Sequence, residues 1–494
     1  MTTENEALIK QAIEFATTGL NDNNPQYAEH ILGFALKEFP DNLELVVFLA
    51  LSKMGLHKWD EARDLLTTAH QMKPDDAAIA DNLGLAESQC GNKQAAIDLF
   101  CKAIELKDDH APAWEHLAMG LNQDGQSEKA LKAIDRGIKT EDKSSLRFNK
   151  AHIYGCLRKP LEAIAEYRKA ILIDDNSDSK FNMSLQLLIT GQWEEGWQNY
   201  EERFNVATFK GQSGRRAKLI ARAPELQKGA ELKGKRLLLY SPQGEGDKIQ
   251  MLRYCPRLKQ LGATLLFECP KSLQDLCRPL VDELVDDPFT ATFDYHIDLM
   301  SLPFYFNTRQ ATVPKNIPYI FDNHKPDPLG DRIKKRIGVC WGGNPQHAND
   351  CNRSCYFKYF EPVAKLPDTE IISLQFDTRK RHWKGIGDID LLEGVDFPYR
   401  VVRDETSDFG HLASVMANCD LIISVDTSVA HLAGAMGLPV AVILPYHCDW
   451  RYGLEGNRCT WYPTMRLYRQ DNTRSFEQVL KLIASDLDNK DIQF

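Results

Sequence analysis

The strongest constraint on this chain is a pattern of small residues that recurs about every 34 positions through its first two hundred residues. The small residues are spaced by 34, 34, 34, 33 and 33 positions: Ala28, Ala62, Ala96, Ala130, Ala163 and Gly196. Most are followed by another small residue after seven positions and by a proline or aspartate after twelve. Small residues let two helices approach closely, and turn-forming residues end them. The period therefore predicts a stack of helical hairpins over residues 1–206.

Three of the repeats carry a glycine five positions before the small residue, which predicts a turn inside each hairpin: Gly91, Gly125 and Gly191. The whole pattern resembles the tetratricopeptide repeat and is clearest over residues 92–106. The last copy, with Trp193 and Trp197, is atypical and is predicted to cap the stack. The resemblance implies that the repeats bind an extended peptide or another protein; a spacer or an arm for homodimerisation is the alternative.

The bulk composition restricts the partners and the compartment. A net charge of −10 argues against nucleic acid as the main partner. No apolar run approaches the roughly 18 residues of a membrane span, and the first residues lack the basic-then-apolar build of a signal peptide. The twelve cysteines are scattered without a CxxC pair or a matching histidine pair. We therefore expect a cytoplasmic protein without a membrane span, a resident cofactor or a metal site.

Basic residues cluster where the helical period fails, within residues 207–234: Lys210, Arg215, Arg216, Lys218 and Arg222. Such a cluster could contact phosphates, but we expect a solvated linker.

A Rossmann-like domain is predicted for residues 235–328. An apolar strand over 236–241 leads into a glycine-rich turn over 242–247, a helix over 248–261 and a second strand over 264–268. The full dinucleotide fingerprint is absent, so NAD is not expected. Further along, three polar residues alternate on one face of an extended segment, which indicates either a site or the wet face of an edge strand: Asp294, His296 and Asp298. We favour the wet face.

A second α/β domain is predicted for residues 329–494, with the join near 326–330. Its clearest element is the stretch 421–445, in which an apolar strand, a polar turn, a short helix of small residues and another apolar strand follow one another. This is the layout of a parallel βαβ unit. Free backbone N–H groups and the helix dipole at such a turn favour an anion such as a phosphate. The turn Asp426-Thr427-Ser428 is therefore predicted to bind one.

Four segments occur in an order that resembles one enzyme family: 243–254, 341–344, 424–435 and 449–451. Together they look like the catalytic region of bacterial tetratricopeptide-repeat glycosyltransferases, related to glycosyltransferase family 9, the heptosyltransferases. The resemblance covers about residues 236–470. It implies a GT-B fold of two Rossmann-like domains, with the acceptor side first and the nucleotide-sugar side second, and an inverting transfer. The expected fold is thus an all-α solenoid followed by a GT-B fold.

The resemblance implies that Asp247 is the general base, because related heptosyltransferases place a carboxylate on this glycine turn. The alternative is that Asp247 only caps the following helix. Guanidinium groups match phosphate oxygens in pairs, so Arg353 and Arg451 are candidate diphosphate partners, with ordinary salt bridges as the alternative. His431 lies one helical turn after Ser428 and is expected at the site; a packed histidine is the alternative. The residues expected to contact the nucleotide sugar are Gly244, Gly246, Trp341, Asn344, Arg353, Asp426, Thr427, Ser428, His431, Trp450 and Arg451.

Three functions remain open at this stage. The first is a metal-independent glycosyltransferase that modifies a protein held by the repeats, for example flagellin or another surface protein. The second is a heptosyltransferase-like enzyme acting on a lipopolysaccharide or another saccharide. The third is a non-catalytic scaffold that binds a nucleotide or a partner. The first is our preferred hypothesis; the donor nucleotide is not predicted.

Overall fold

The computed structural model describes residues 3–22, 24–206, 209–321, 329–332, 334–347, 349–376, 380–383, 387–402 and 408–489. The chain divides into two compact units, and the main boundary between them falls between Asp175 and Asn176. Among the described helices, none combines the length and the apolar character that crossing a membrane requires.

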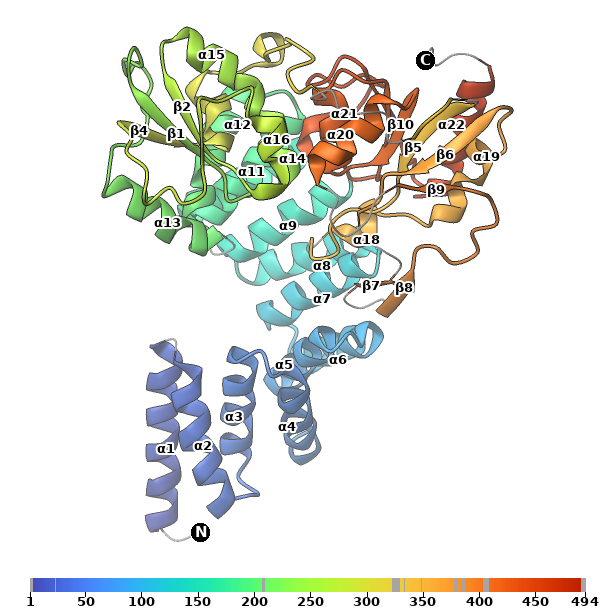
Figure 1. Ribbon diagram of the computed structural model, residues 1–494. Helices are drawn as coiled ribbons and strands as arrows, with labels where there is room; N and C mark the ends of the chain where they lie inside the picture. The colour runs from blue at the N-terminus through green and yellow to red at the C-terminus, as the bar shows by residue number, and fades with distance from the viewer. Residues whose placement is uncertain are drawn as a thin grey trace. The chain divides into compact units, whose positions relative to one another are not determined.

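The first unit consists of helical hairpins, drawn from blue to cyan in Figure 1. Its helices in the described residues pair in chain order: α1 (Thr3–Asn21) with α2 (Pro25–Glu38), α3 (Leu43–Gly55) with α4 (Trp59–Met72), α5 (Ala77–Gln89) with α6 (Lys93–Leu106), α7 (Ala111–Gln123) with α8 (Ser127–Thr140), and α9 (Ser144–Cys156) with α10 (Pro160–Ile173). The predicted helical repeats are therefore confirmed. The alanines that define the period are buried where the two helices of a hairpin meet: Ala28, Ala62, Ala96, Ala130 and Ala163.

In the hairpins after the first, the turn between the two helices uses a left-handed backbone conformation at one fixed place in the repeat. The predicted turn glycines have positive φ, at +92° for Gly91, +81° for Gly125 and +82° for Gly191. The equivalent positions in two other hairpins are His57 and Arg158, with φ of 58° and 56°. Glycine adopts this conformation without steric cost, whereas other residues adopt it only when the surrounding structure imposes it. The repeat geometry thus holds even where the glycine signal is missing.

The last helical hairpin is part of the second unit. It comprises α11 (Ser177–Ile189) and α12 (Trp193–Tyr200), followed by η1 (Glu201–Asn205). The indole of Trp193 stacks on that of Trp461 with ring centroids 5.4 Å apart, and Trp197 meets Trp450 edge-on at 5.1 Å. The tryptophans that mark the last repeat as atypical therefore belong to the core of the second unit. The predicted domain boundaries at 206, 234 and 328 remain predictions.

The predicted solvated linker is wrong for its central part, because α13 (Lys210–Ile220) forms there. Its Leu219 is fully buried against the first sheet. Arg215 pairs with Glu268, and Arg216 donates to Glu225 at 2.6 Å. These basic residues of the helix are thus paired with carboxylates of the same unit, which a count of positive charges in the sequence could not show.

The first sheet is parallel, with strand order β3-β2-β1-β4. Its strands are β1 (Arg236–Tyr240), β2 (Thr264–Glu268), β3 (Glu283–Val285) and β4 (Tyr295–Asp298). The predicted helix over 248–261 is interrupted. It begins earlier as α14 (Glu245–Met251), passes through the 3-10 turn η3 (Leu252–Tyr254), and continues as α15 (Cys255–Gln260), in which proline is one of the first residues. Because proline lacks an N–H, the helical hydrogen bonds break before it.

The prediction of a wet face on β4 is wrong, although β4 is an edge strand. His296 and Asp298 are both fully buried. The segment before β1 covers the edge, with the Leu226 N–H donating to the His296 carbonyl at 2.9 Å. The Arg203 guanidinium of η1 approaches Asp298 at 3.4 Å. Segments distant in the sequence therefore bury a face that alternation alone marks as exposed.

The second sheet is also parallel, with strand order β12-β11-β10-β5-β6-β9. Its strands are β5 (Lys335–Cys340), β6 (Thr369–Ser373), β9 (Arg400–Val401), β10 (Leu421–Val425), β11 (Val440–Leu444) and β12 (Met465–Arg469). The helices α20 (Phe409–Ala417), α21 (Ser428–Ala435) and α22 (Phe476–Asp488) pack around it (Figure 1). The predicted βαβ unit at 421–445 is confirmed. The predicted join at 326–330 lies partly outside the described residues.

The order of the second sheet reverses between β5 and β10. The chain moves from β5 to β6 on one side and later returns to β10 on the other. In open parallel sheets, ligands bind outside the carboxyl ends of the strands at such a switch point. A ligand is therefore expected to bind at the loops after β5 and β10.

Candidate active site

A cavity of about 280 Å³ lies at this switch point. It is bordered by the loop after β5, the residues after β6, the start of α20 and the turn that begins α21: Cys340, Gly342, Gly343, Asn344, Pro345, Gln375, Phe376, Phe409, Thr427, Ser428 and Val429. The α21 turn was predicted from local pattern and Asn344 from family resemblance. The structure brings Asn344, Thr427 and Ser428 to one cavity.

The loop after β5 is shaped by two glycines that leave no room for a side chain. A Cβ on Gly342 would lie 2.7 Å from the Arg381 guanidinium, and one on Gly343 would lie 2.6 Å from that of Arg353. The amide of Gln375 ties this loop to the end of β6, because its Oε1 accepts from the Gly342 N–H at 2.9 Å and its Nε2 donates to the Gly342 carbonyl at 3.0 Å. Gln375 was not predicted from the sequence.

The turn at the start of α21 lines the cavity with Thr427, Ser428 and Val429. Thr427 is the N-cap residue with an extended backbone, and its side chain makes no capping hydrogen bond to the helix. The first N–H groups of a helix have no partner within that helix. Together with the hydroxyl groups of Thr427 and Ser428, they form an arrangement suited to a phosphate. Anion binding by the turn remains a prediction.

Asp426 lies beside this turn and is half-buried. Its Oδ1 accepts a hydrogen bond of 2.7 Å from the Tyr452 hydroxyl. Burial, with the nearby negative charge of Asp449, raises the pKa of Asp426 to about 6. Tyr452 was not predicted as a site residue. Its position three residues after Asp449 was the available signal, but nothing in the sequence connects it to Asp426.

Arg353 lies behind the cavity wall at the end of the short helix α18 (Asp350–Arg353). Its Nη1 donates to the Asp426 carbonyl at 3.4 Å, and its Nε lies 3.6 Å from Asp350 Oδ1. That Nε is buried and has no hydrogen-bond partner among the described residues. The guanidinium therefore retains donor capacity next to Gly343 and the anion turn.

Asp247 is the third residue of α14, and both of its oxygens are engaged. Its Oδ2 accepts from the Gly244 N–H at 3.1 Å, which satisfies one of the free donors at the start of the helix. Asp247 thus caps the helix from its third position, whereas the alternative placed it as the residue before the helix; the N-cap residue is Gly244. Its Oδ1 is paired with Arg451. A carboxylate has about four lone-pair sites, so each oxygen can still accept another proton donor.

Gly246 allows α14 to pack directly on α21. A Cβ on Gly246 would lie 2.9 Å from His431 Cδ2 and 3.4 Å from Ser428 Cα. The contact joins the two Rossmann-like domains close to the anion turn. Glycine at this position is thus required by close approach of the helices, in addition to any contact with a ligand.

His431 is a buried, neutral residue. Burial, together with the positive charges of Arg451, Arg253 and Arg353, lowers the pKa of His431 well below its ordinary value. Its Nδ1 lies 3.0 Å from the Tyr462 hydroxyl. The His431 ring is therefore packed in the interior, as the alternative prediction states. A direct role at the donor site remains a prediction.

Two predicted site residues lie in aromatic cores instead of at the cavity. The Trp341 ring stacks on Phe357 with centroids 3.9 Å apart. The Trp450 ring packs edge-on against Trp197 and Trp461. The family resemblance identified these two positions, but a sequence motif does not show in which direction a side chain points.

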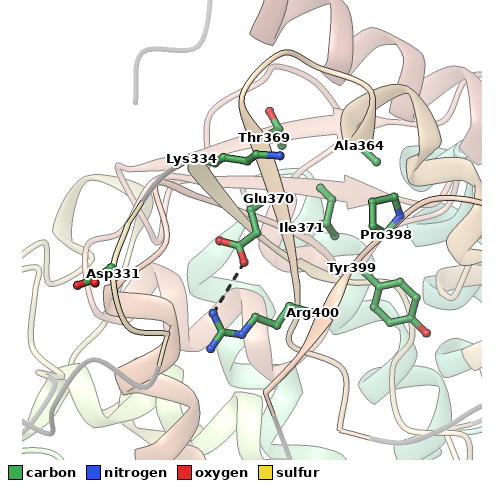
Figure 2. Close-up of a pocket in the computed structure, with 9 residues that line it drawn as sticks. All are labelled: Asp331, Lys334, Ala364, Thr369, Glu370, Ile371, Pro398, Tyr399 and Arg400. Atoms are coloured by element: carbon green, nitrogen blue, oxygen red, sulfur yellow. Dashed lines mark ion pairs between the residues drawn. The ribbon is translucent and has the colours of Figure 1, made fainter.

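Another cavity, of about 450 Å³, lies at the opposite end of the same sheet (Figure 2). It is bordered by the amino ends of β6 and β9, and Glu370 and Arg400 face each other across it at 3.8 Å. None of the predicted site residues lies there. Within the described ranges, no three His, Cys, Asp or Glu side chains gather as a metal ion would need.

Comparisons with known proteins agree with this architecture. Residues 393–452 match the model of glycosyltransferase family 9 (heptosyltransferase), and residues 77–110 and 144–177 match the tetratricopeptide repeat. The family 9 match includes Asp426, Thr427, Ser428, His431, Trp450 and Arg451 and leaves out Asp247. The predicted resemblance is confirmed: tetratricopeptide repeats precede a parallel α/β region similar to glycosyltransferase family 9. These matches support a glycosyltransferase with a repeat domain.

A curated relative is Protein FlbA of Caulobacter vibrioides (strain ATCC 19089 / CIP 103742 / CB 15), which is 24% identical over 352 residues. The alignment covers 64% of this chain and 55% of FlbA, so the chain spans about half the length of the curated relative it matches. Among solved structures, the thermophilic TPR protein TTC0263 of Thermus thermophilus is 20% identical, with a TM-score of 0.33 over 37% of this chain and 99% of that one. MamA is 22% identical, with a TM-score of 0.29 over 32% of this chain and 94% of that one.

Proposed function

We propose that this protein transfers a sugar from a nucleotide-sugar donor to a hydroxyl group of a protein acceptor, without a metal ion. The observation that carries the proposal is the cavity at the β5/β10 switch point, which is lined by Thr427 and Ser428 of the α21 turn and by Gly343, the glycine beside the Arg353 guanidinium. In the same unit, α14 brings Asp247 next to that turn through the contact of Gly246 with Ser428. An anion site and a carboxylate on facing domains are what such a transfer needs.

In the proposed reaction the bond between the sugar C1 and the diphosphate oxygen breaks, and a bond from C1 to the acceptor oxygen forms. The leaving diphosphate keeps the electron pair of the broken bond. The N–H groups of α21, the hydroxyls of Thr427 and Ser428, and Arg353 stabilise its charge. The acceptor hydroxyl proton passes to Asp247, which acts as the general base. Displacement from the face opposite the leaving group inverts the configuration at C1.

The donor site is tested by thermal-shift screening of UDP-, GDP-, ADP-, dTDP- and CMP-linked sugars with the full-length protein. We expect one nucleotide class to raise the melting temperature, because a ligand that binds only the folded state stabilises it. The same shift should be lost on Thr427→Val combined with Ser428→Ala. Full binding by this double variant would contradict the assignment of the turn.

The general base is tested with Asp247→Asn, which keeps the size and the capping oxygen. We expect a folded protein whose transfer rate falls by about 10²–10⁴-fold. The matched control is Asp294→Asn, an aspartate of the same domain that pairs with Lys235 at the protein surface. Near wild-type turnover of the Asp247 variant would show that another group takes the proton.

The acceptor is proposed to be a protein because tetratricopeptide repeats form the first unit. Flagellin or another surface protein is the first acceptor to test. A saccharide acceptor is the second candidate, since the matching family model is that of the heptosyltransferases. Radiolabelled transfer to purified protein and to lipopolysaccharide core distinguishes the two. A cytoplasmic location and a homodimer formed through the repeats remain predictions.

A further inference from the structure

The side chain of Arg451 lies between the two Rossmann-like domains, against the face of α14 that carries Asp247. It is supplied by η8 (Trp450–Tyr452), which follows β11. Asp247 and Gln250 are three residues apart on α14 and therefore point to the same side of the helix. Arg451 contacts both of them. The second domain thus provides a cation to the carboxylate of the first.

All three nitrogens of the Arg451 guanidinium are already engaged. Nε donates to Gln250 Oε1 at 2.6 Å, Nη1 donates to Asp449 Oδ1 at 2.9 Å, and Nη2 pairs with Asp247 Oδ1. The Trp450 ring centroid lies 4.3 Å from the guanidinium carbon. The side chain is only 9% exposed. A guanidinium held on three sides has little freedom to turn toward another ligand.

Arg353 is also mostly buried, at 15% exposed, but it differs from Arg451 in its hydrogen bonds and ion pairs. Its nearest hydrogen-bond acceptor is a backbone carbonyl at 3.4 Å, and its closest carboxylate lies 3.6 Å away. Its Nε has no hydrogen-bond partner among the described residues, and a Cβ on Gly343, which lines the cavity, would lie 2.6 Å from its guanidinium. Two arginines were predicted as diphosphate partners. Of these, Arg353 is the one with an N–H group that lacks a hydrogen-bond partner among the described residues, and it lies beside a residue that lines the cavity.

The support of Arg451 extends to the last helical hairpin of the chain. The Trp450 ring that faces the guanidinium packs edge-on against Trp197 of α12 at 5.1 Å. Tyr200, one turn further along α12, lies 6.5 Å from the same ring. The aromatic contact fixes Trp450 and, through it, one face of Arg451.

We propose that Arg451 is a positioning residue for Asp247 and not a ligand of the donor diphosphate, and that Gln250 and Asp449 hold it in that role. This inference rests on the proposed function of the site. The guanidinium fixes the orientation of the Asp247 carboxylate and holds its Oδ1 in place, which leaves the remaining lone pairs directed for proton transfer. The diphosphate is then bound by the α21 turn and Arg353.

The test compares Arg451→Gln with Arg353→Gln in the full-length protein. The probes are UDP, GDP, ADP, dTDP and CMP, and the one that binds the wild type is titrated into each variant by calorimetry. We expect Arg353→Gln to weaken binding by about tenfold or more, because it removes a charged partner of the phosphate. Arg451→Gln should bind the same nucleotide within about threefold of the wild type, yet turn over the corresponding sugar at least about tenfold more slowly with little change in KM.

Two further variants separate positioning from general damage to the fold. Gln250→Leu leaves both charges in place and removes only the acceptor of the Arg451 Nε–H, so it should lower kcat in the same direction without weakening nucleotide binding. Arg451→Lys keeps the charge and should restore part of the kcat lost in Arg451→Gln. If Arg451→Gln does not fold, the kcat of each of these two variants is compared with that of the wild type and should lie below it.

The outcomes are distinguishable. Equal weakening of nucleotide binding by Arg451→Gln and Arg353→Gln would make Arg451 a diphosphate ligand and overturn the inference. If Gln250→Leu and Arg451→Lys both have the kcat of the wild type, the inference is overturned as well. If the wild type binds none of the five nucleotides, the proposed donor site itself is wrong, and the role of Arg451 falls with it.

Discussion

Among single residues, Asp298 shows how burial can make stability depend on pH. The side chain is fully buried, and its Oδ2 has no hydrogen-bond partner among the described residues. Burial outweighs the attraction of Arg203 and raises the pKa of Asp298 from its ordinary value of 3.8 to about 6. The folded protein therefore binds this proton more tightly than the unfolded chain does.

The resulting prediction concerns the window between about pH 4 and pH 6, set by the ordinary and the raised pKa of Asp298. As the pH rises through it, the unfolded chain loses the Asp298 proton before the folded protein does, so the free energy of unfolding falls. The contribution of Asp298 to the free energy of unfolding falls by about 3 kcal/mol across the window and is constant above it. Asp298→Asn should remove this part of the pH dependence, as measured by melting temperature at about pH 4.5 and about pH 7.

The control for this prediction is Asp294→Asn, on the same extended segment. The backbone N–H of Arg236 donates to Asp294 at 2.8 Å, and this bond lowers the pKa of Asp294. Its contribution to stability has the opposite sign and is lost only as the pH falls to about 3.8 and below. Asp294→Asn should therefore keep the wild-type change in stability between about pH 4.5 and about pH 7. If Asp298→Asn shows the same pH dependence as the wild type and as Asp294→Asn, Asp298 does not control stability in this range.

Among secondary-structure elements, the contact between α14 and α21 depends on the absence of a side chain at Gly246. Gly246→Ala would place a Cβ 2.9 Å from His431 and 3.4 Å from the backbone of Ser428. Separating two packed helices to accept a methyl group typically costs about 1–3 kcal/mol. We expect a lower melting temperature and weaker nucleotide binding, because the anion turn lies on the helix that must move.

Gly244→Ala is the matched variant for this element. A Cβ on Gly244 would meet only Asp247 Oδ2, at 3.5 Å, and the backbone there has an ordinary φ of −65°. This substitution should therefore change stability by less than about 1 kcal/mol. Equal melting temperatures for the two variants would show that α14 and α21 do not pack closely at Gly246.

For the molecule as a whole, the last hairpin should be necessary for the α/β region to fold. Trp193 and Trp197 are buried in its core, and Arg203 is buried with Ser301 at 2.7 Å. Losing one buried tryptophan side chain typically costs about 3–5 kcal/mol, whereas a domain is stable by about 5–15 kcal/mol in total. Removing both tryptophans with their hairpin is therefore enough to unfold it.

Two truncations test this expectation. A protein beginning at Asn176 keeps the hairpin and should melt cooperatively and bind the same nucleotide as the full chain. A protein beginning at Val206 lacks it and should be insoluble or melt without a cooperative transition. Measurements by circular dichroism and nucleotide titration compare them. A stable, nucleotide-binding protein that begins at Val206 would show that the hairpin belongs functionally to the repeats alone.

Features that depend on local spacing could be predicted from the amino-acid sequence. The 34-residue period predicted the helical hairpins because small residues recur where helices touch. The apolar runs at 421–425 and 440–444 were predicted as strands because turn-forming residues bound them, and the two strands pair in the structure. The Asp426–Ser428 turn was placed for the same reason. The motif match added Asp247 and Arg451, but not their mutual contact.

The partners of residues far apart in the chain followed only from the tertiary structure. Asp247 and Arg451 are 204 residues apart, and no periodicity relates them. The same holds for the burial of Asp298 by Arg203, for Gly246 against His431, and for the last hairpin, whose tryptophans pack on Trp450 and Trp461. Local propensity follows from a residue and its neighbours, whereas burial and charge pairing depend on which segments the fold brings together.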